Sequence, residues 1–375
     1  MTLSVTRGAQ IADGNEPASG CVDASVRLSV LDLVPVRTDQ TTADALAATV
    51  RLAQTADRLG YTRYWVAEHH NMASVAATSP PVVLAYLAAQ TERIRLGSGG
   101  VMLPNHAPLA VAEQFALLEA AAPGRVDLGI GRAPGSDPVT SMALRGARAH
   151  NDEDIERFPE YLDHVAALMS ADGAHVALTR GMLTEQDYLL KATPSAVGEP
   201  RLWLLGSSMY SAHLAAAKGL PYVFANHFSG QGTAEALAAY RAEFRPSALT
   251  PEPVTFMTVN ASVAGSREEA LRLLLPNLQM MARLRTGRPL GPLDLVEDAE
   301  AAVLSPQEQL IVDSGPARTV VGDPAEAAEQ IRSVAAQFDV DEVMVAPVAS
   351  AFRGTDARTA PGRDQTLELL AKELL

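Results

Sequence analysis

The chain has 375 residues, and its 44 acidic against 30 basic side chains give a formal charge of −14. General nucleic-acid binding depends on clustered Lys and Arg, so this acidity argues against it. The single cysteine, Cys21, excludes an internal disulfide and any zinc or iron–sulfur site built from this chain's cysteines alone. No apolar run approaches the roughly 18 residues of a membrane span, so we expect a cytoplasmic protein without nucleic-acid or membrane partners.

The first segment, residues 1–25, mixes glycine, proline and small polar residues with few large apolar ones. Such a segment cannot bury enough apolar surface to offset its ordering entropy. We therefore predict a flexible leader that is followed by the folded part of the chain.

From residue 26 onward, short β-branched and leucine-rich runs alternate with segments of helical spacing. The first helix is predicted to begin after Thr41, a good N-cap residue, and to end at Gly60. The predicted strands cover 26–34, 63–67, 94–102, 125–131, 202–205, 222–225, 254–263 and 342–345. The other predicted helices cover 80–90, 108–121, 152–169, 209–219, 233–244, 266–284 and 324–338. Stretches 170–200 and 285–319 fit neither period and are predicted to be irregular insertions.

Eight strands with helices between them are typical of a parallel sheet covered on both faces. Eight such units predict a (β/α)8 TIM barrel, an α/β fold that uses about 250 residues and leaves the rest for insertions. A doubly wound open sheet is the alternative, but Gly129, Gly131 and Gly135 have the wrong spacing for its dinucleotide-binding signature. We therefore predict one barrel domain over residues 26–375.

Barrel enzymes build their sites from residues at the carboxyl ends of the strands, and the second predicted strand ends in Glu68, His69 and His70. Imidazoles beside a carboxylate can act as acids, bases or metal ligands. A hydrogen-bonded loop histidine without a chemical role is an equally good interpretation of the spacing. A metal site would need ligands from scattered positions such as Asp32 or His106, and we expect no metal.

Glycines mark the ends of the next two strands, in the runs 97–100 (GSGG) and 129–132 (GIGR). Glycines beside a strand indicate a bulge or another group that approaches the backbone closely, such as a flat ring. Tight packing between layers of the barrel is the alternative. Arg132, which follows the second run, provides a cation that can hold an anion.

An anion site is also predicted where the strand 202–205 passes into a helix, at Gly206, Ser207, Ser208 and Ser211. Backbone N–H groups, the helix dipole and serine hydroxyls meet there, which suits a phosphate group. Ordinary N-capping by one serine is the simpler alternative. In an acidic chain the positive charge must be local, and Arg132 and Arg157 are the candidates to supply it.

Four motifs together resemble the bacterial luciferase-like flavin monooxygenases, a family that includes tailoring oxygenases of the mensacarcin type. They are 65–71 (WVAEHHN), 96–104 (LGSGGVMLP), 123–135 (PGRVDLGIGRAPG) and 203–211 (WLLGSSMYS). The resemblance implies a TIM barrel, a homodimer, and FMN that a separate flavin reductase supplies in reduced form. In this family reduced FMN reacts with O2 to give a C4a-peroxyflavin, which oxygenates a small organic substrate.

By position, the resemblance assigns His69, after Glu68, as the catalytic histidine. It places Ser98 and Gly99 against the isoalloxazine ring, where the family often has a non-proline cis peptide. Gly131 stands beside the flavin where luciferase has a reactive cysteine, so light emission is not implied. The remaining cofactor residues implied are those of the phosphate site, namely Arg132, Arg157, Gly206, Ser207, Ser208 and Ser211.

The sequence leaves the exact function, the substrate and the position of the active-site loop open. A deazaflavin-dependent dehydrogenase of the same superfamily, or a flavin-binding protein without turnover, would have similar motifs. The high content of alanine and arginine favours a GC-rich genome and secondary metabolism such as antibiotic biosynthesis, hence a polyketide substrate. The family's mobile active-site loop would correspond to the stretch after Met169 or to the stretch after Arg285.

Overall fold

The computed structural model describes residues 26–375 apart from 134–136, 147–152, 178–186, 194–197, 199, 229 and 248–249. The predicted leader, 1–25, therefore lies outside the described residues.

Eight of the described strands form a closed parallel barrel. They are β1 (Arg27–Asp32), β2 (Arg63–Val66), β3 (Arg95–Ser98), β5 (Val126–Gly131), β8 (Arg201–Gly206), β9 (Tyr222–Phe224), β10 (Thr255–Val263) and β12 (Glu342–Pro347). Each pairs with the next in this order, and β12 pairs back with β1. The TIM-barrel prediction is confirmed, because every predicted strand overlaps one of these eight and the closed sheet rules out the open alternative.

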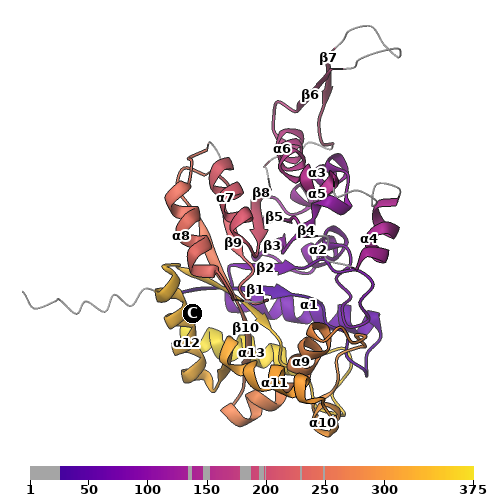
Figure 1. Cartoon of the computed structure of the whole chain (residues 1–375), viewed down its shortest axis with the longest axis vertical. Helices are drawn as coiled ribbons and strands as arrows, with labels where there is room; N and C mark the ends of the chain where they lie inside the picture. The colour runs from indigo at the N-terminus through magenta and orange to yellow at the C-terminus, as the bar shows by residue number, and fades with distance from the viewer. Residues whose placement is uncertain are drawn as a thin grey trace, which may run out of the picture.

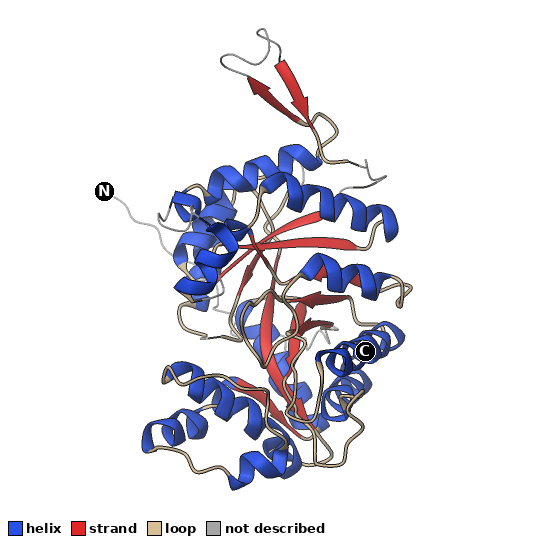
Figure 2. Cartoon of the chain, turned by 90° about the vertical axis from the view of Figure 1, so that its right-hand side faces the viewer, coloured by secondary structure: helices blue, strands red, loops and turns tan. Residues whose placement is uncertain are grey.

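Helices surround the barrel (Figure 2). Those on the predicted pattern are α1 (Thr42–Leu59), α2 (Pro80–Ala88), α3 (Pro108–Ala121), α6 (Phe158–Met169), α7 (Met209–Lys218), α8 (Thr233–Glu243), α9 (Arg267–Arg285) and α12 (Pro324–Phe338). Helix α1 shows why the local signals succeed. Thr41 forms a capping box with Asp44, and Gly60 ends the helix at a φ of 87° that favours glycine.

The predicted insertion 285–319 is not irregular. It contains α10 (Val296–Ala301), α11 (Pro306–Ser314) and η3 (Pro316–Arg318), and it leads into β11 (Thr319–Gly322). Strand β11 pairs with residues 260–263 of β10. These elements have two to three turns at most, so they show too little periodicity for the sequence to reveal them.

Other short elements were also missed. They are η1 (Leu103–Asn105), α4 (Pro138–Arg145), β6 (Ala174–Ala177), β7 (Asp187–Leu190) and the longer C-terminal helix α13 (Pro361–Leu374). The predicted strand 94–102 contains β3 and the separate short strand β4 (Val101–Met102), and the predicted helix 152–169 contains α5 (Glu153–Glu156). The helix predicted over 152–169 is divided at Arg157, where Pro159 begins a new helix, α6. Strands β6 and β7 form an antiparallel hairpin that projects from the body of the molecule beyond α6 (Figure 1).

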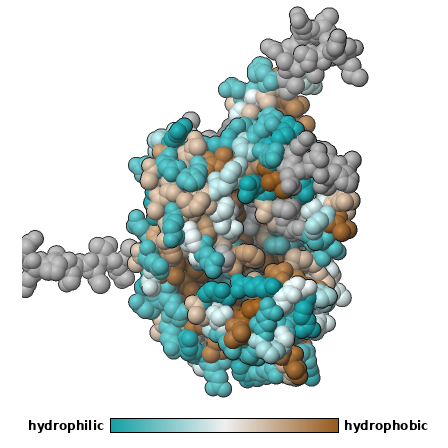
Figure 3. Space-filling model, viewed as in Figure 1, coloured by the Kyte–Doolittle hydropathy of each residue, from teal (hydrophilic) through white to brown (hydrophobic). Residues whose placement is uncertain are grey.

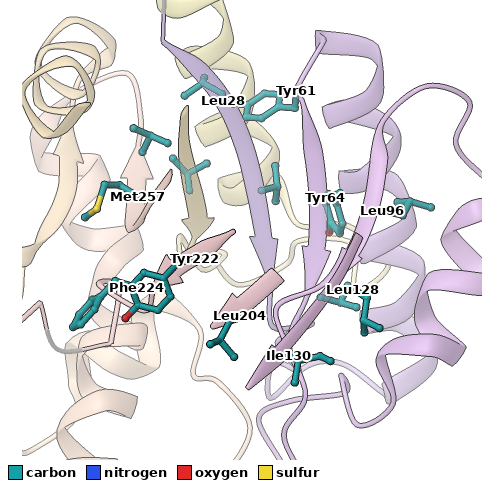
Figure 4. Close-up of a cluster of buried hydrophobic side chains, with 14 of the residues drawn as sticks. Leu28, Tyr61, Tyr64, Leu96, Leu128, Ile130, Leu204, Tyr222, Phe224 and Met257 are labelled. Carbon is teal, nitrogen blue, oxygen red and sulfur yellow. The ribbon is translucent and has the colours of Figure 1, made fainter. Parts of the chain in front are cut away.

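Two apolar layers hold the barrel together. The larger one lies between the strands and the helices and includes Leu28, Tyr64, Leu204 and Phe224 (Figure 4). The second layer fills the barrel interior, where side chains of strands that are not neighbours meet. Trp65 of β2 lies edge-on to Trp203 of β8, with ring centroids 5.6 Å apart.

A buried ion network closes the amino-terminal end of the barrel. Arg63, at the start of β2, lies 2.7 Å from a carboxylate oxygen of Asp127 and 2.6 Å from one of Glu342. Its guanidinium stacks over Trp203 at 4.9 Å. Because this end is filled with paired charges, open space for a ligand must be sought at the carboxyl ends of the strands.

Across the residues that the structure describes, no helix combines the length and the apolar composition that crossing a bilayer would require.

Candidate active site

The carboxyl ends of the parallel strands meet at one end of the barrel. This brings together segments that are far apart in the chain. They are Glu68–His70 after β2, Gly99–Gly100 after β3, Gly131–Arg132 after β5, Gly206–Ser208 at the end of β8, and Asn226–His227 after β9.

Glu68 is a buried carboxylate that holds two histidines. Its Oε1 lies 2.8 Å from Nε2 of His70 and 2.8 Å from Nε2 of His106, and its Oε2 accepts the N–H of Met102 at 3.0 Å. Burial raises the pKa of Glu68, but the hydrogen bonds from His106 and His70 outweigh it, so that this pKa is lowered overall. Glu68 therefore stays ionised and fixes the end of β2 against the segment after β3.

His69 points elsewhere and its imidazole is not held in this way. Its backbone N–H donates to the carbonyl of Ala77 at 2.9 Å, whereas its Nδ1 is buried and has no hydrogen-bond partner among the described residues. Burial lowers the pKa of His69, and the nearby His70 adds to this effect while Glu68 opposes it. The imidazole is therefore neutral at pH 7, the state in which it can accept a proton.

A second histidine at the site, His227, was missed by the sequence analysis. Its Nδ1 lies 3.0 Å from the hydroxyl of Thr258. Burial, together with the charge of His69, lowers the pKa of His227 to about 4. The signal was available, because His227 follows the predicted strand 222–225 just as His69 follows the predicted strand 63–67.

The glycines in and just after β3 are explained by packing in the barrel interior. A Cβ at Gly97 would lie 2.5 Å from Nε1 of Trp65, and one at Gly99 would lie 2.7 Å from Cδ1 of Leu31. The peptide between Gly99 and Gly100 is cis, one residue beyond the pair Ser98 and Gly99 to which the resemblance assigned ring contacts. The hydroxyl of Ser98 is buried and donates to the carbonyl of Gly129 at 2.8 Å.

Gly131 differs from these glycines. The nearest atom that a Cβ would meet at this position is the carbonyl oxygen of Val101, at 4.0 Å. Protein packing therefore does not require glycine here, and the space beside the end of β5 is open.

The first turn of α7 presents free donors. Ser208 is its N-cap residue but makes no capping hydrogen bond, and both Ser207 and Ser208 are exposed. The guanidinium of Arg132 lies over the ring of Tyr210, 4.2 Å from its centroid, which places this cation beside the same turn. The N-terminus of α7 therefore has an uncapped dipole, two free hydroxyls and one cation within a small region.

The remaining phosphate-site candidates have other partners. Ser211 is buried, its hydroxyl donates to the carbonyl of Ser208 at 2.7 Å, and it lies 3.1 Å from the hydroxyl of Tyr222. A side chain at Gly206 would collide with Ser211, so that this glycine serves close packing. Arg157 lies between α5 and α6 and forms a bidentate pair with Glu160, at 2.9 and 2.7 Å. Its role in cofactor binding stays a prediction.

A cavity of about 390 Å³ opens beside His227. Its described lining comes from the β9–α8 segment, β10, α9, α11 and η3, and includes Phe228, Asn260, Asn277, Met281 and Ile311. The stretch after Arg285 thus borders this cavity, whereas the described part of the stretch after Met169 forms the projecting hairpin.

Comparisons with known proteins identify the family of the chain. The family model described as luciferase-like monooxygenase matches residues 26–341. A luciferase-like monooxygenase of Escherichia coli K12 is 40% identical over 86% of this chain and 92% of its own length. The N-acetyl-S-alkylcysteine monooxygenase of Bacillus subtilis is 34% identical over 87% of this chain and 94% of its own. The crystal structure of apo-MsnO8 superposes with a TM-score of 0.79 at 35% identity, covering 93% of this chain and 99% of the other.

The chain belongs to the luciferase-like monooxygenase family. The resemblance inferred from the four sequence motifs is thereby confirmed.

Proposed function

We propose that this protein is a flavin-dependent monooxygenase that uses reduced FMN and O2 to oxygenate a small organic substrate. The observation that carries the proposal is His69, a buried and neutral imidazole whose Nδ1 has no partner among the described residues. A buried polar atom without a partner is costly unless a ligand or a reacting group satisfies it.

The residues at the mouth of the barrel fit FMN in three respects. The uncapped N-terminus of α7, with Ser207 and Ser208, suits a phosphate dianion, and Arg132 adds a positive charge. The open space beside Gly131 leaves room for a ring next to the strand ends. When bound, reduced FMN supplies the electrons that activate O2, and one oxygen atom passes to the substrate.

The chain's own residues then have separate tasks. Arg132 and the α7 turn bind the phosphate, and Glu68 orients His70 and His106 around the site. His69 accepts or returns a proton at its imidazole, near the flavin or the substrate. Apolar walls such as Leu278 and Met281 exclude water, which would otherwise divert oxygen into H2O2.

Two partners belong to this proposal. The first is a separate flavin reductase that supplies reduced FMN. The second is another copy of the chain.

The proposed dimer surface is formed by large apolar side chains that α2, α3 and α4 expose, including Val82 (68% exposed) and Leu117 (57% exposed). Figure 3 shows the apolar surface of α4 in brown at the right-hand edge. Light scattering of wild type and of Leu117→Glu tests the dimer, and an unchanged mass for this variant would contradict this surface.

The cavity also bears on the substrate. A volume of about 390 Å³ is near the lower end of the range of roughly 300 to 1,000 Å³ for ligand pockets. This size favours a compact substrate over a polycyclic polyketide.

Stopped-flow spectroscopy separates the proposed function from its rivals. Protein titrated anaerobically with reduced FMN is mixed with O2, and the flavin spectrum is followed against free reduced FMN. We expect tight binding and a reoxidation time course distinct from that of the free flavin. Reoxidation identical to that of free FMN would overturn the proposal. Hydride exchange with a deazaflavin would favour the dehydrogenase, and bound FMN that does not react with O2 would favour a storage protein.

A further inference from the structure

The cavity beside His227 has a charge opposite to that of the chain. Its described lining includes two arginines, Arg285 and Arg318, and no Asp or Glu. The whole chain has 44 acidic and 30 basic residues. A cavity lined by two arginines and no carboxylate favours anions, because its local charge is positive.

The two arginines lack the carboxylate partners that their neighbours have. Arg283 is paired with Asp294 at 2.9 Å, and Arg288 is paired with Glu308 at 2.7 Å. Within the described part of the chain, Arg285 and Arg318 form no ion pair, and Arg285 donates only to the backbone carbonyl of Phe228, at 3.1 Å. Partial burial, and the positive charge of Arg318, lower the pKa of Arg285. Both arginines are exposed to solvent, border the same cavity, and have no counter-charge among the described residues.

The other side of the cavity is polar but uncharged. Asn260 donates its side-chain N–H to the carbonyl of His227 at 2.9 Å, and Asn226 donates to the carbonyl of Thr258 at 3.1 Å. His227 is in turn close enough to His69 for its pKa to respond to the charge of His69. Leu278, Met281 and Ile311 form apolar walls. The cavity therefore combines a cationic rim, apolar walls and an end near the reacting histidine.

We propose that this cavity binds the substrate, that the substrate is a small organic carboxylate, and that Arg285 and Arg318 together hold its carboxylate group. The apolar body of the substrate then lies against Leu278 and Met281, with its oxidisable atom toward His227, the histidine that lines the cavity. A guanidinium group has the opposite charge to a carboxylate and the planar donor geometry that pairs with it. In this proposal, the two arginines therefore determine the specificity of the enzyme for carboxylate substrates. The identification of the ligand as the substrate rests on the proposed function.

The flavin phosphate has a different candidate site. The α7 N-terminus and Arg132 lie at the ends of β5 and β8, whereas Arg285 and Arg318 border a cavity beyond β9 and β10. The two anion sites can therefore be tested separately.

The test measures binding by the full chain without flavin, by isothermal titration calorimetry. The probes are butanoate, octanoate and hydrocinnamate, the primary amide of each, and inorganic phosphate. The variants are Arg285→Met, Arg318→Met and both together, which keep an unbranched apolar stem. Arg51→Met is the matched control, because Arg51 is exposed on α1 and loses the same charge outside the cavity. Circular dichroism verifies that each variant is folded.

We expect at least one acid to bind more tightly than its amide, by about tenfold. Each single cavity variant should lose most of that preference, the double variant should lose all of it, and Arg51→Met should keep it. FMN affinity should be the same in all variants.

Several results would overturn the proposal. The proposal is wrong if none of the acids binds, or if each acid binds no more tightly than its amide. It is also wrong if the double variant binds the acids as tightly as wild type, or if Arg51→Met loses as much of the acid preference as the cavity variants do. Tighter binding of phosphate than of any acid through the same arginines, or a parallel loss of FMN affinity, would assign the arginines to a phosphate and would also overturn it. Because these measurements use the chain without flavin, the acid-binding result does not depend on whether reduced FMN reacts. Failure of the carboxylate proposal can therefore be distinguished from failure of the proposed function.

Discussion

His69 and His227 are two imidazoles that the fold keeps uncharged at neutral pH. Both lose hydration on burial, which disfavours the protonated form and lowers the pKa of each. The carboxylate of Glu68 forms its histidine contacts with His70 and His106, and not with His69 or His227. The site thus contains a carboxylate that is fixed by two histidines and a third histidine, His69, whose Nδ1 has no hydrogen-bond partner among the described residues.

Replacing His69 should affect the reaction more than cofactor binding. In His69→Ala we expect FMN affinity to stay within about twofold of wild type, since the phosphate site lies elsewhere. The fraction of consumed O2 that appears as H2O2 should rise, because proton transfer is lost. Oxygen consumption, H2O2 and product are measured together with any substrate that the wild type oxygenates. His164→Ala, an exposed histidine on α6, is the control, and unchanged coupling in His69→Ala would remove His69 from the mechanism.

His227 predicts a pH dependence of stability. The unfolded chain takes up a proton on this histidine below about pH 6.5, whereas the folded chain does so only near its pKa of about 4. The unfolded state therefore binds more protons in this window, and stability falls as the pH is lowered from about 6.5 to about 4. Between these two pH values, the free energy of unfolding of His227→Gln should fall by about 2 to 3 kcal/mol less than that of wild type. Urea unfolding at both pH values measures this, and parallel losses in the two proteins would contradict it.

At the scale of single elements, helix α7 combines a start without a capping side chain with a cation beside its first turn. Helix α1 satisfies some of its free N–H groups with the side chain of Thr41, whereas α7 does not, and α2 and α3 also lack a capping side chain. In α7 the N-cap serine leaves these groups uncapped, and Arg132 lies beside the same turn. This combination is the reason why we propose the N-terminus of α7 as the site of the flavin phosphate.

Arg132 should select for the flavin phosphate. We expect Arg132→Met to weaken FMN binding by about tenfold and to leave riboflavin, which lacks the phosphate, almost unchanged. Arg51→Met provides the comparison, because Arg51 is exposed on α1 and is not among the predicted cofactor residues. Fluorescence quenching of the two flavins measures both affinities. An equal loss for FMN and riboflavin would place Arg132 against the ring system and not at the phosphate.

At the scale of the whole molecule, a buried ion pair joins the two ends of the described chain. Asp32 at the end of β1 pairs with Arg363 of α13 and also accepts the hydroxyl groups of Tyr64 and Thr49, at 2.5 and 2.9 Å. Arg363 donates in addition to the carbonyl of Pro347 at the end of β12. The first and last strands of the barrel are therefore fastened to the C-terminal helix at one point.

Removing one member of this pair should be costly. Asp32→Asn leaves the guanidinium of Arg363 buried without a counter-charge, so we expect a loss of about 3 to 5 kcal/mol in the free energy of unfolding. Asp341→Asn breaks the exposed pair with Arg27 and should cost less than about 1 kcal/mol. Urea denaturation at pH 7 measures both. A similar loss of unfolding free energy in the two variants would contradict the prediction that the buried Asp32 pair matters more for stability than the exposed pair.

Much of the fold was predictable because its signals are local. Strands of a parallel barrel are buried on both faces and appear as continuous apolar runs, and caps such as Thr41 and Gly60 lie next to the helix they bound. The candidate site was predictable in part by the same means, since polar residues after strand ends mark the mouth of a barrel. His227 obeyed that rule and was missed, whereas α10 and α11 were too short to show a period.

The amino-acid sequence by itself determined the barrel, the family and the residues at the ends of its strands, because these depend on short-range patterns of apolar residues and on contiguous motifs. Only the tertiary structure decided which of those residues are free to act. Glu68 is occupied by His106, 38 positions away, and Asp32 by Arg363, 331 positions away. Whether a buried group has a partner depends on residues that the fold, and not the chain order, brings within hydrogen-bonding distance. For that reason, only the tertiary structure shows that, among the described residues, Nδ1 of His69 has no hydrogen-bond partner and the two arginines of the cavity form no ion pair.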